Sequence, residues 1–240
     1  MPEPRNHFRI AALFSVVAAW LISTGWNIAD AADEKKPATP PAAKKKAEGE
    51  SSWTSLFDGK SLANWKATDF AGHGEVRVEK GQMMLDMGVA LTGVTLTNTN
   101  LLPRIDYEVE LDAMKMDGVD FFCGLTMPVD KEHCTLICGG WGGAVVGISS
   151  IDGMDASEND TTKFVKFDKG HWYHIRVRVA KDKIECWIDN EKLVDQDISG
   201  RKISMRPGEI EEAEPFGLST WQTSSAIKNI RVRRLESAKK

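Results

Sequence analysis

Residues 172–189 read WYHIRVRVAKDKIECWID, and this stretch decides the fold class. Apolar side chains occupy every second position from Tyr173 to Val179, and the same alternation resumes from Ile184 to Ile188. A helix would need apolar residues at three- and four-residue spacing instead. The short polar turn between the two runs has the length typical of a hairpin. The stretch therefore predicts two adjacent antiparallel strands.

The same alternation extends through the rest of the chain. YEVELDA at residues 107–113 and IKNIRVRRL at residues 227–235 each place apolar residues on one face and charged residues on the other. Short polar turns such as EKGQ (79–82) and DNEK (189–192) separate further strand-like runs. Many short strands joined by tight turns favour an all-β fold, an antiparallel β-sandwich, over residues 53–235.

The predicted domain opens with LFDGKSLANWK, residues 56–66. Asp58 and Gly59 form a turn, because glycine reaches backbone conformations that other residues avoid. We expect Phe57 to be buried against the sandwich, and Leu62 and Trp65 to cover an edge or end of a sheet. In this interpretation the motif is structural.

The N-terminus carries an export signal. Arg5 and Arg9 precede an apolar run, and Ala29 and Ala31 form a small-x-small cleavage pattern, so residues 1–31 are predicted to be a signal peptide. An uncleaved membrane anchor is the alternative. Residues 32–52 are rich in Lys, Pro and Ala and predict a disordered linker, and residues 236–240 form a tail. We expect a periplasmic or extracellular protein with no stable membrane insertion after cleavage.

Charge and cysteine content limit the possible partners. A net charge of -4, with no basic stripe, excludes nucleic acid as an expected partner. The four cysteines lack a CxxC pair, which disfavours zinc. If DFFCGLTM (120–127) and HCTLICGG (133–140) form a hairpin with Met127 opposite Cys134, then Cys123 lies opposite Cys138, either as a cross-strand disulfide or as part of the apolar core.

Five segments carry a resemblance to a known family: SLFDGKSLANWK (55–66), VEKGQMMLD (78–86), YEVELDA (107–113), GHWYHIRVRVAKDKIECWIDNEKLVDQD (170–197) and IKNIRVRRL (227–235). The chain resembles the secreted bacterial 3-keto-disaccharide hydrolases, or 3-keto-glucoside lyase/hydratases. The resemblance implies a concanavalin/laminin-G-like jelly roll. It also implies hydrolysis, or elimination and hydration, of 3-keto-glycosides. The alternative is a non-catalytic, lectin-like module that binds a glycan or acts in cell-surface interactions.

The implied chemistry requires a base, a cation that stabilises an enolate, and an acid for the leaving group. The catalytic candidates are His174, Arg176, Asp112 and Glu185, all on polar strand faces. His174 is otherwise a surface histidine, and Arg176 a solvated cation paired with Glu185. A divalent metal is a possible cofactor of unknown location. The acidic loop DGMDASEND (152–160) is either a calcium site or a solvated loop.

Aromatic residues supply the candidates for saccharide binding. Trp141 lies in the glycine-rich segment CGGWGG (138–143), which would leave its indole clear of neighbours as a platform for a sugar ring. The alternative is that Trp141 fills a space in the core or in a loop. Trp187, Trp221 and Gln222 complete the predicted substrate-binding set. The family pattern expects a Tyr-Glu-x-Gln-like strand and a Gln-Asp-His-Gly-like segment. This chain has HCTLICGGWGGAVVGI (133–148) and GLSTWQTSSAIKNI (217–230) there, and only Gln222 echoes the second motif.

Overall fold

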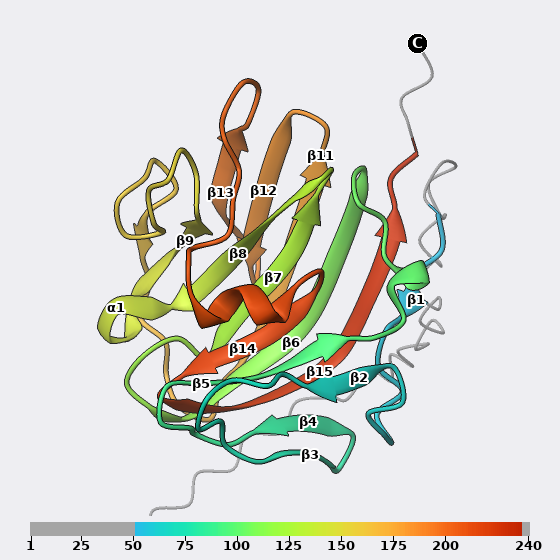
Figure 1. Cartoon of the computed structure of the whole chain (residues 1–240), viewed down its shortest axis with the longest axis vertical. Coiled ribbons are helices and arrows are strands. Elements are labelled where there is room, and N and C mark those ends of the chain that lie inside the picture. The colour runs from blue at the N-terminus through green and yellow to red at the C-terminus, as the bar shows by residue number, and fades with distance from the viewer. Residues whose placement is uncertain (1–50, 237–240) are drawn as a thin grey trace, which may run out of the picture. The chain divides into compact units, whose positions relative to one another are not determined.

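The computed structural model describes residues 51–236, which form a sandwich of two antiparallel sheets (Figure 1). The predicted signal peptide and nearly all of the predicted linker lie outside the described residues, as do residues 237–240. Within residues 51–236, no helix is long and apolar enough to cross a membrane. The predicted all-β fold is confirmed.

One sheet has eight strands, in the order β13-β12-β11-β6-β15-β4-β3, with β1 pairing to β15. Its members are β1 (Thr54–Ser55), β3 (Val76–Glu79), β4 (Gln82–Leu85), β6 (Tyr107–Gly118), β11 (Trp172–Ala180), β12 (Lys183–Ile188), β13 (Glu191–Asp197) and β15 (Thr223–Arg234). The turns predicted at EKGQ (79–82), at DNEK (189–192) and between Val179 and Ile184 (AKDK, 180–183) join neighbouring antiparallel strands of this sheet.

The second sheet has seven strands, in the order β10-β9-β8-β7-β14-β5-β2. Its members are β2 (Trp65–Ala67), β5 (Leu91–Leu96), β7 (Cys123–Val129), β8 (Glu132–Gly139), β9 (Val145–Ser149), β10 (Lys163–Phe164) and β14 (Gly217–Trp221). The short helical elements are η1 (Thr99–Leu101), α1 (Gly140–Gly143) and η2 (Glu209–Ala213). In Figure 1 the orange η2 segment crosses the face of this sheet that points away from the other one.

Side-chain alternation separates the core from the two outer faces. Tyr107, Val109 and Leu111 are each at most 1% exposed and belong to the main hydrophobic cluster between the sheets. The alternate positions Glu108 and Glu110 point to the outer face of the eight-stranded sheet, because successive strand residues face opposite sides. This is the arrangement that the sequence pattern predicts.

The opening motif is structural, as expected. Phe57 is buried, and Trp65 lies in the edge strand β2, where its indole N–H donates to the Leu56 carbonyl over 2.8 Å. The Asp58 carboxylate accepts the backbone N–H groups of Lys60 and Ser61 at 2.8 and 2.9 Å. These backbone hydrogen bonds lower the pKa of Asp58, because they favour its ionised form.

The cysteines lie in the core. Strands β7 and β8 place Cys123 opposite Cys138 and Met127 opposite Cys134, which confirms the predicted hairpin register. All four cysteines are free and buried, so the structure has the packing alternative rather than a disulfide. Burial raises the pKa of the Cys134 thiol to about 12.

Candidate functional site

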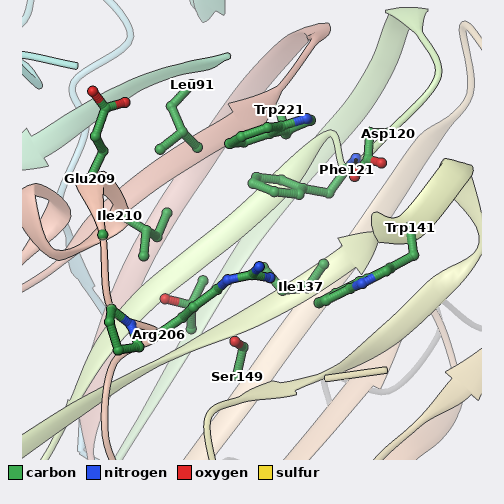
Figure 2. A pocket seen from close by; sticks show the side chains of 13 residues that line it. Leu91, Asp120, Phe121, Ile137, Trp141, Ser149, Arg206, Glu209, Ile210 and Trp221 are labelled. Atoms are coloured by element: carbon green, nitrogen blue, oxygen red, sulfur yellow. Dashed lines mark hydrogen bonds between the residues drawn. The ribbon is translucent and has the colours of Figure 1, made fainter. Parts of the chain in front are cut away.

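A pocket of about 410 Å³ opens on the outer face of the seven-stranded sheet (Figure 2). Strands β5, β8, β9 and β14, the β6–β7 connection, α1, and η2 with the segment before it surround the pocket. Its lining residues are Leu91, Asp120, Phe121, Thr135, Ile137, Trp141, Ser149, Arg206, Pro207, Gly208, Glu209, Ile210 and Trp221. The floor is largely apolar, since Leu91, Phe121 and Ile137 belong to a second hydrophobic cluster outside the main core.

Trp141 projects into the pocket from the α1 turn. Its backbone has φ 49° and ψ 56°, a left-handed conformation that is rare for a bulky side chain. Gly139, Gly142 and Gly143 in this turn also have positive φ, so Trp141 occupies a kind of position that the turn otherwise fills with glycine. This strained position presents a large, 42% exposed indole to the pocket.

Asp120 stabilises the α1 turn through two hydrogen bonds to backbone N–H groups. One carboxylate oxygen accepts the Gly142 N–H at 2.9 Å, and the other accepts the Phe121 N–H at 2.8 Å. Below the turn lies Lys115, which is only 5% exposed. Burial lowers the pKa of Lys115, and the nearby Asp120 carboxylate partly opposes that effect. The Asp120 carboxylate therefore holds the turn in place and has both oxygens engaged.

Trp221 reaches the same pocket from the end of β14. Its indole is 39% exposed, and its backbone N–H donates to the Phe121 carbonyl at 3.1 Å. The next residue, Gln222, does not line the pocket. Its side chain donates to the Val89 carbonyl at 3.2 Å, and its backbone N–H donates to the Ala90 carbonyl. Gln222 thus holds the β4–β5 connection beside the pocket.

Arg206 is the positively charged side chain that lines the pocket. It lies on the segment 205–208, which crosses strand β8 and is called the strap below. An Arg206 guanidinium nitrogen lies 2.8 Å from an Asp155 carboxylate oxygen, and the Ser149 hydroxyl donates to the same carboxylate. The guanidinium carbon is 5.9 Å from the centre of the Trp141 ring. Figure 2 shows the Arg206 side chain extending across Ile137 toward Trp141.

These features suit a ligand that is apolar on its faces and polar at its edge. Two exposed indoles offer flat apolar surface, while the exposed side chains of Arg206 and Glu209 offer a donor and an acceptor beside it. A pyranose ring has this character, because its C–H groups form apolar patches and its hydroxyls project outward. The pocket is also within the volume range usual for small-molecule sites.

The predicted catalytic residues lie on the other side of the core. His174 and Asp112 are directly opposite each other on β11 and β6, with 2.9 Å between His174 Nδ1 and an Asp112 carboxylate oxygen. Arg176 shares this outer face of the eight-stranded sheet, 3.6 Å from the fully buried Glu108. The structure brings these three together but separates them from the pocket by the hydrophobic core.

Glu185 and Trp187 also lie on this second face. The Glu185 carboxylate accepts the Lys192 ammonium at 2.6 Å and lies 3.7 Å from Arg178. The Arg176 guanidinium carbon lies 3.9 Å from the centre of the Trp187 ring. This cation covers one face of the indole, which a sugar ring would otherwise contact. Of the four predicted substrate-binding residues, only Trp141 and Trp221 share the pocket.

Neither the pocket nor the acidic loop provides a metal-ligand set. In the described part of the chain, no group of three or more His, Cys, Asp or Glu side chains is arranged to hold a metal ion. The pocket carboxylate of Asp120 already accepts two backbone N–H groups. In the acidic loop, Arg201 contacts the carboxylates of both Asp152 and Asp160. A divalent metal therefore does not fit these residues.

Sequence reasoning missed the residues supplied by irregular segments. Asp120, Phe121, Arg206 and Glu209 come from the β6–β7 connection and from the long segment between β13 and β14. Neither segment has a periodic pattern that would show which side chains share a cavity. The only local signal was the Pro-Gly pair at residues 207–208, which marks a turn.

Residues 52–233 match the model of the 3-keto-alpha-glucoside-1,2-lyase-like domain family, and the chain belongs to this family of carbohydrate-active domains. No curated protein sequence matches the chain. Among solved structures, it is similar to the carbohydrate-binding module CBM66 from Bacillus subtilis, at 14% identity and a TM-score of 0.45, covering 71% of this chain and 95% of that one. It is also similar to domain 4 of AbnA, a GH43 extracellular arabinanase from Geobacillus stearothermophilus, at 12% identity and a TM-score of 0.46, covering 72% and 84%.

Proposed function

We propose that this domain binds a saccharide in the pocket, with the sugar against the indoles of Trp141 and Trp221. The observation that carries the proposal is that two exposed indoles from separate parts of the chain line one cavity. Large, rigid aromatic side chains give much contact area for little loss of side-chain entropy. The hydroxyl groups then bond to Arg206 and Glu209 at the polar edge.

Departure from the family pattern also supports a binding role. The resemblance expects a histidine in a Gln-Asp-His-Gly-like segment, whereas this chain has GLSTWQ at residues 217–222. In that segment Trp221 lines the pocket. A tryptophan offers a stacking surface but neither accepts nor releases a proton in catalysis. We further propose that the domain acts outside the cytoplasm, on the strength of the predicted signal peptide at residues 1–31.

Calorimetric titration of the purified protein against a panel of glycans tests the proposal. Trp141→Ala and Trp221→Ala should each weaken binding about 30-fold, because an aromatic residue at the centre of an interface contributes roughly 2 kcal/mol. Trp187→Ala is the matched control and should bind as wild type does. Unchanged affinity in both pocket variants, or loss only in the control, would rule out the pocket as the binding site.

A second candidate function is cleavage of 3-keto-glycosides, which the family and the pair of Arg206 and Glu209 in one pocket favour. The ketone acidifies the proton on the neighbouring C2. Glu209 would accept that proton, and Arg206 would stabilise the enolate oxygen. The C1–O glycosidic bond then breaks, the leaving oxygen takes up the proton held by Glu209, and water adds across the resulting C1=C2 double bond.

Incubation with a 3-keto-disaccharide separates the two candidates. Release of the free sugar by wild type, lost in Glu209→Gln but retained in His174→Gln, would support cleavage in the pocket. Binding of unoxidised glycan without any turnover of the keto sugar would leave the binding role alone. Loss of turnover in His174→Gln with retention in Glu209→Gln would instead place the chemistry on the eight-stranded sheet.

A further inference from the structure

A second cavity, of about 530 Å³, lies on the same outer face of the seven-stranded sheet. It is bounded by the β7–β8 turn, by the loop after β9 and by the strap. Its lining includes Lys131, Glu132, His133, Lys202, Pro207 and Glu211. Pro207 lines this cavity and the first pocket as well, so the two are separated by one thin wall.

Strand β8 runs beneath both cavities. His133, Thr135 and Ile137 point to the same side of β8, since they alternate with the buried Cys134 and Leu136. His133 lines the second cavity, whereas Thr135 and Ile137 line the first. A strand rises about 3.4 Å per residue, so His133 and Ile137 are about 14 Å apart along one continuous floor.

The strap divides this floor at one point. The Thr135 hydroxyl donates to the Met205 sulfur at 3.7 Å, and Met205 is 7% exposed. Arg206, the next residue, turns back into the first pocket and is held there by Asp155. A ligand that fills the first pocket therefore reaches the second by passing over Pro207, which is exposed.

The second cavity differs in chemistry from the first. Its lining is polar and carries both charges, with Lys131 and Lys202 opposed by Glu132 and Glu211. His133 is held at its wall, with Nδ1 3.2 Å from a Glu214 carboxylate oxygen and Nε2 3.5 Å from Arg104. Positively charged donors and negatively charged acceptors can both bond to the hydroxyl groups of a sugar. A charged substituent on the ligand, whether positive or negative, would lie near a side chain of the same charge.

We propose that the second cavity is a second saccharide subsite, which holds an uncharged sugar unit linked to the one bound against Trp141 and Trp221. The preferred ligand of the domain is then a neutral oligosaccharide rather than a single sugar. This inference rests on the proposed function of the first pocket. It specifies that the ligand is an uncharged oligosaccharide, because a chain long enough to occupy two adjoining sites binds with higher affinity than a single sugar.

The test compares affinity for a monosaccharide with affinity for a neutral tri- or tetrasaccharide of the same sugar. Wild type should bind the longer ligand about tenfold more tightly, in low and high salt alike. The double variant Lys131→Ala/Lys202→Ala should lose this gain and keep its affinity for the monosaccharide. The matched control Lys60→Ala/Lys181→Ala removes two exposed lysines outside both cavities and should keep the gain.

A second readout reports on the cavity directly. The imidazole NMR signal of His133, assigned with His133→Gln, should move when the oligosaccharide binds and stay in place with the monosaccharide. Monosaccharide binding without a length gain, or a gain with no change at His133, would overturn the second subsite and leave the first intact. Absence of binding at every length would overturn the proposed function itself. A length gain only for acidic oligosaccharides, lost in high salt, would refute the neutral ligand.

Discussion

Both outer faces of the sandwich carry tryptophans, but the two sets have different neighbours. On the seven-stranded sheet, the rings of Trp141 and Trp221 are open to a pocket. On the eight-stranded sheet, Lys228 lies 3.8 Å from the centre of the Trp172 ring and Arg176 lies 3.9 Å from that of Trp187. Two arginines likewise lie within 4.9 Å of the Trp53 ring centre. An indole already covered by a cation has less surface to offer a ligand.

The carboxylates follow the same division. Glu108, fully buried on the eight-stranded sheet, accepts hydrogen bonds from Arg178 and Arg233, with Arg176 at 3.6 Å. Glu110 is paired with Arg231. Glu209, in the pocket, has no cationic partner among the described residues. Glu209 therefore differs from the glutamates of the eight-stranded sheet in its pairing rather than in its residue type.

The largest effect is expected where the network is most buried. Glu108→Ala removes the acceptor shared by three guanidinium groups, and breaking such a buried pair costs about 3–5 kcal/mol. The free energy of unfolding, measured in urea, should fall by this amount. Glycan affinity of the folded variant should stay unchanged. A loss of affinity at full stability would show that this face, rather than the pocket, carries function.

The next largest effect is expected from Cys134, in the core between the two sheets, and it concerns the pH dependence of stability. Cys134 titrates near pH 12 in the folded state and near its ordinary value when unfolded. Because the pKa of the thiol is higher in the folded state, the unfolded state loses this proton first as the pH rises. The contribution of the Cys134 thiol to the free energy of unfolding is therefore complete below about pH 8.5 and declines above that pH. Each pH unit above that point should cost about 1.4 kcal/mol for this thiol. Urea titrations from pH 8 to 10 should show a smaller decline in Cys134→Ala; equal slopes would contradict the burial.

A substitution at Trp141 tests whether this pocket residue lowers the stability of the fold while contributing to glycan binding. Trp141→Gly relieves the left-handed backbone, which costs an L-residue about 1 kcal/mol, so the free energy of unfolding should rise by about that much. Glycan binding should weaken about 30-fold, as in Trp141→Ala. Trp187→Gly is the matched comparison. It places glycine in a strand and should lower stability without affecting binding. Equal destabilisation in the two variants would refute the strain.

The smallest effect is expected at His174, whose side chain is 43% exposed. Its contact with Asp112 resembles a surface ion pair, which contributes about 0–1 kcal/mol. His174→Gln should therefore change urea stability by less than about 1 kcal/mol and leave glycan affinity unaltered. A large loss of affinity in this variant would move the binding site to the eight-stranded sheet.

The fold was accessible from the sequence because alternation specifies both strand and face. YEVELDA and WYHIRVRVA predicted the inward rows of Tyr107 and Tyr173 and the polar outer rows. The hairpin register of Cys123 and Cys138 followed from one assumed pair. Period-two patterns carry this information because a shift of one residue would expose the entire apolar row.

The site was only partly accessible, for two physical reasons. Alternation indicates that Arg176 and Trp187 face outward, but not that the cation lies over the indole. The strap has no periodicity, so its approach to β8 depends on long-range packing such as the contact between Thr135 and Met205. Trp141 was predicted correctly to stand clear of its neighbours, because its flanking glycines permit the turn that exposes it.

A crystal structure of the protein with a bound neutral oligosaccharide tests the central claim most directly. The account predicts sugar density against Trp141 and Trp221, with the adjoining unit over Pro207 toward His133. Density over Trp187 and His174, on the outer face of the eight-stranded sheet, with the pocket empty of sugar, would contradict it.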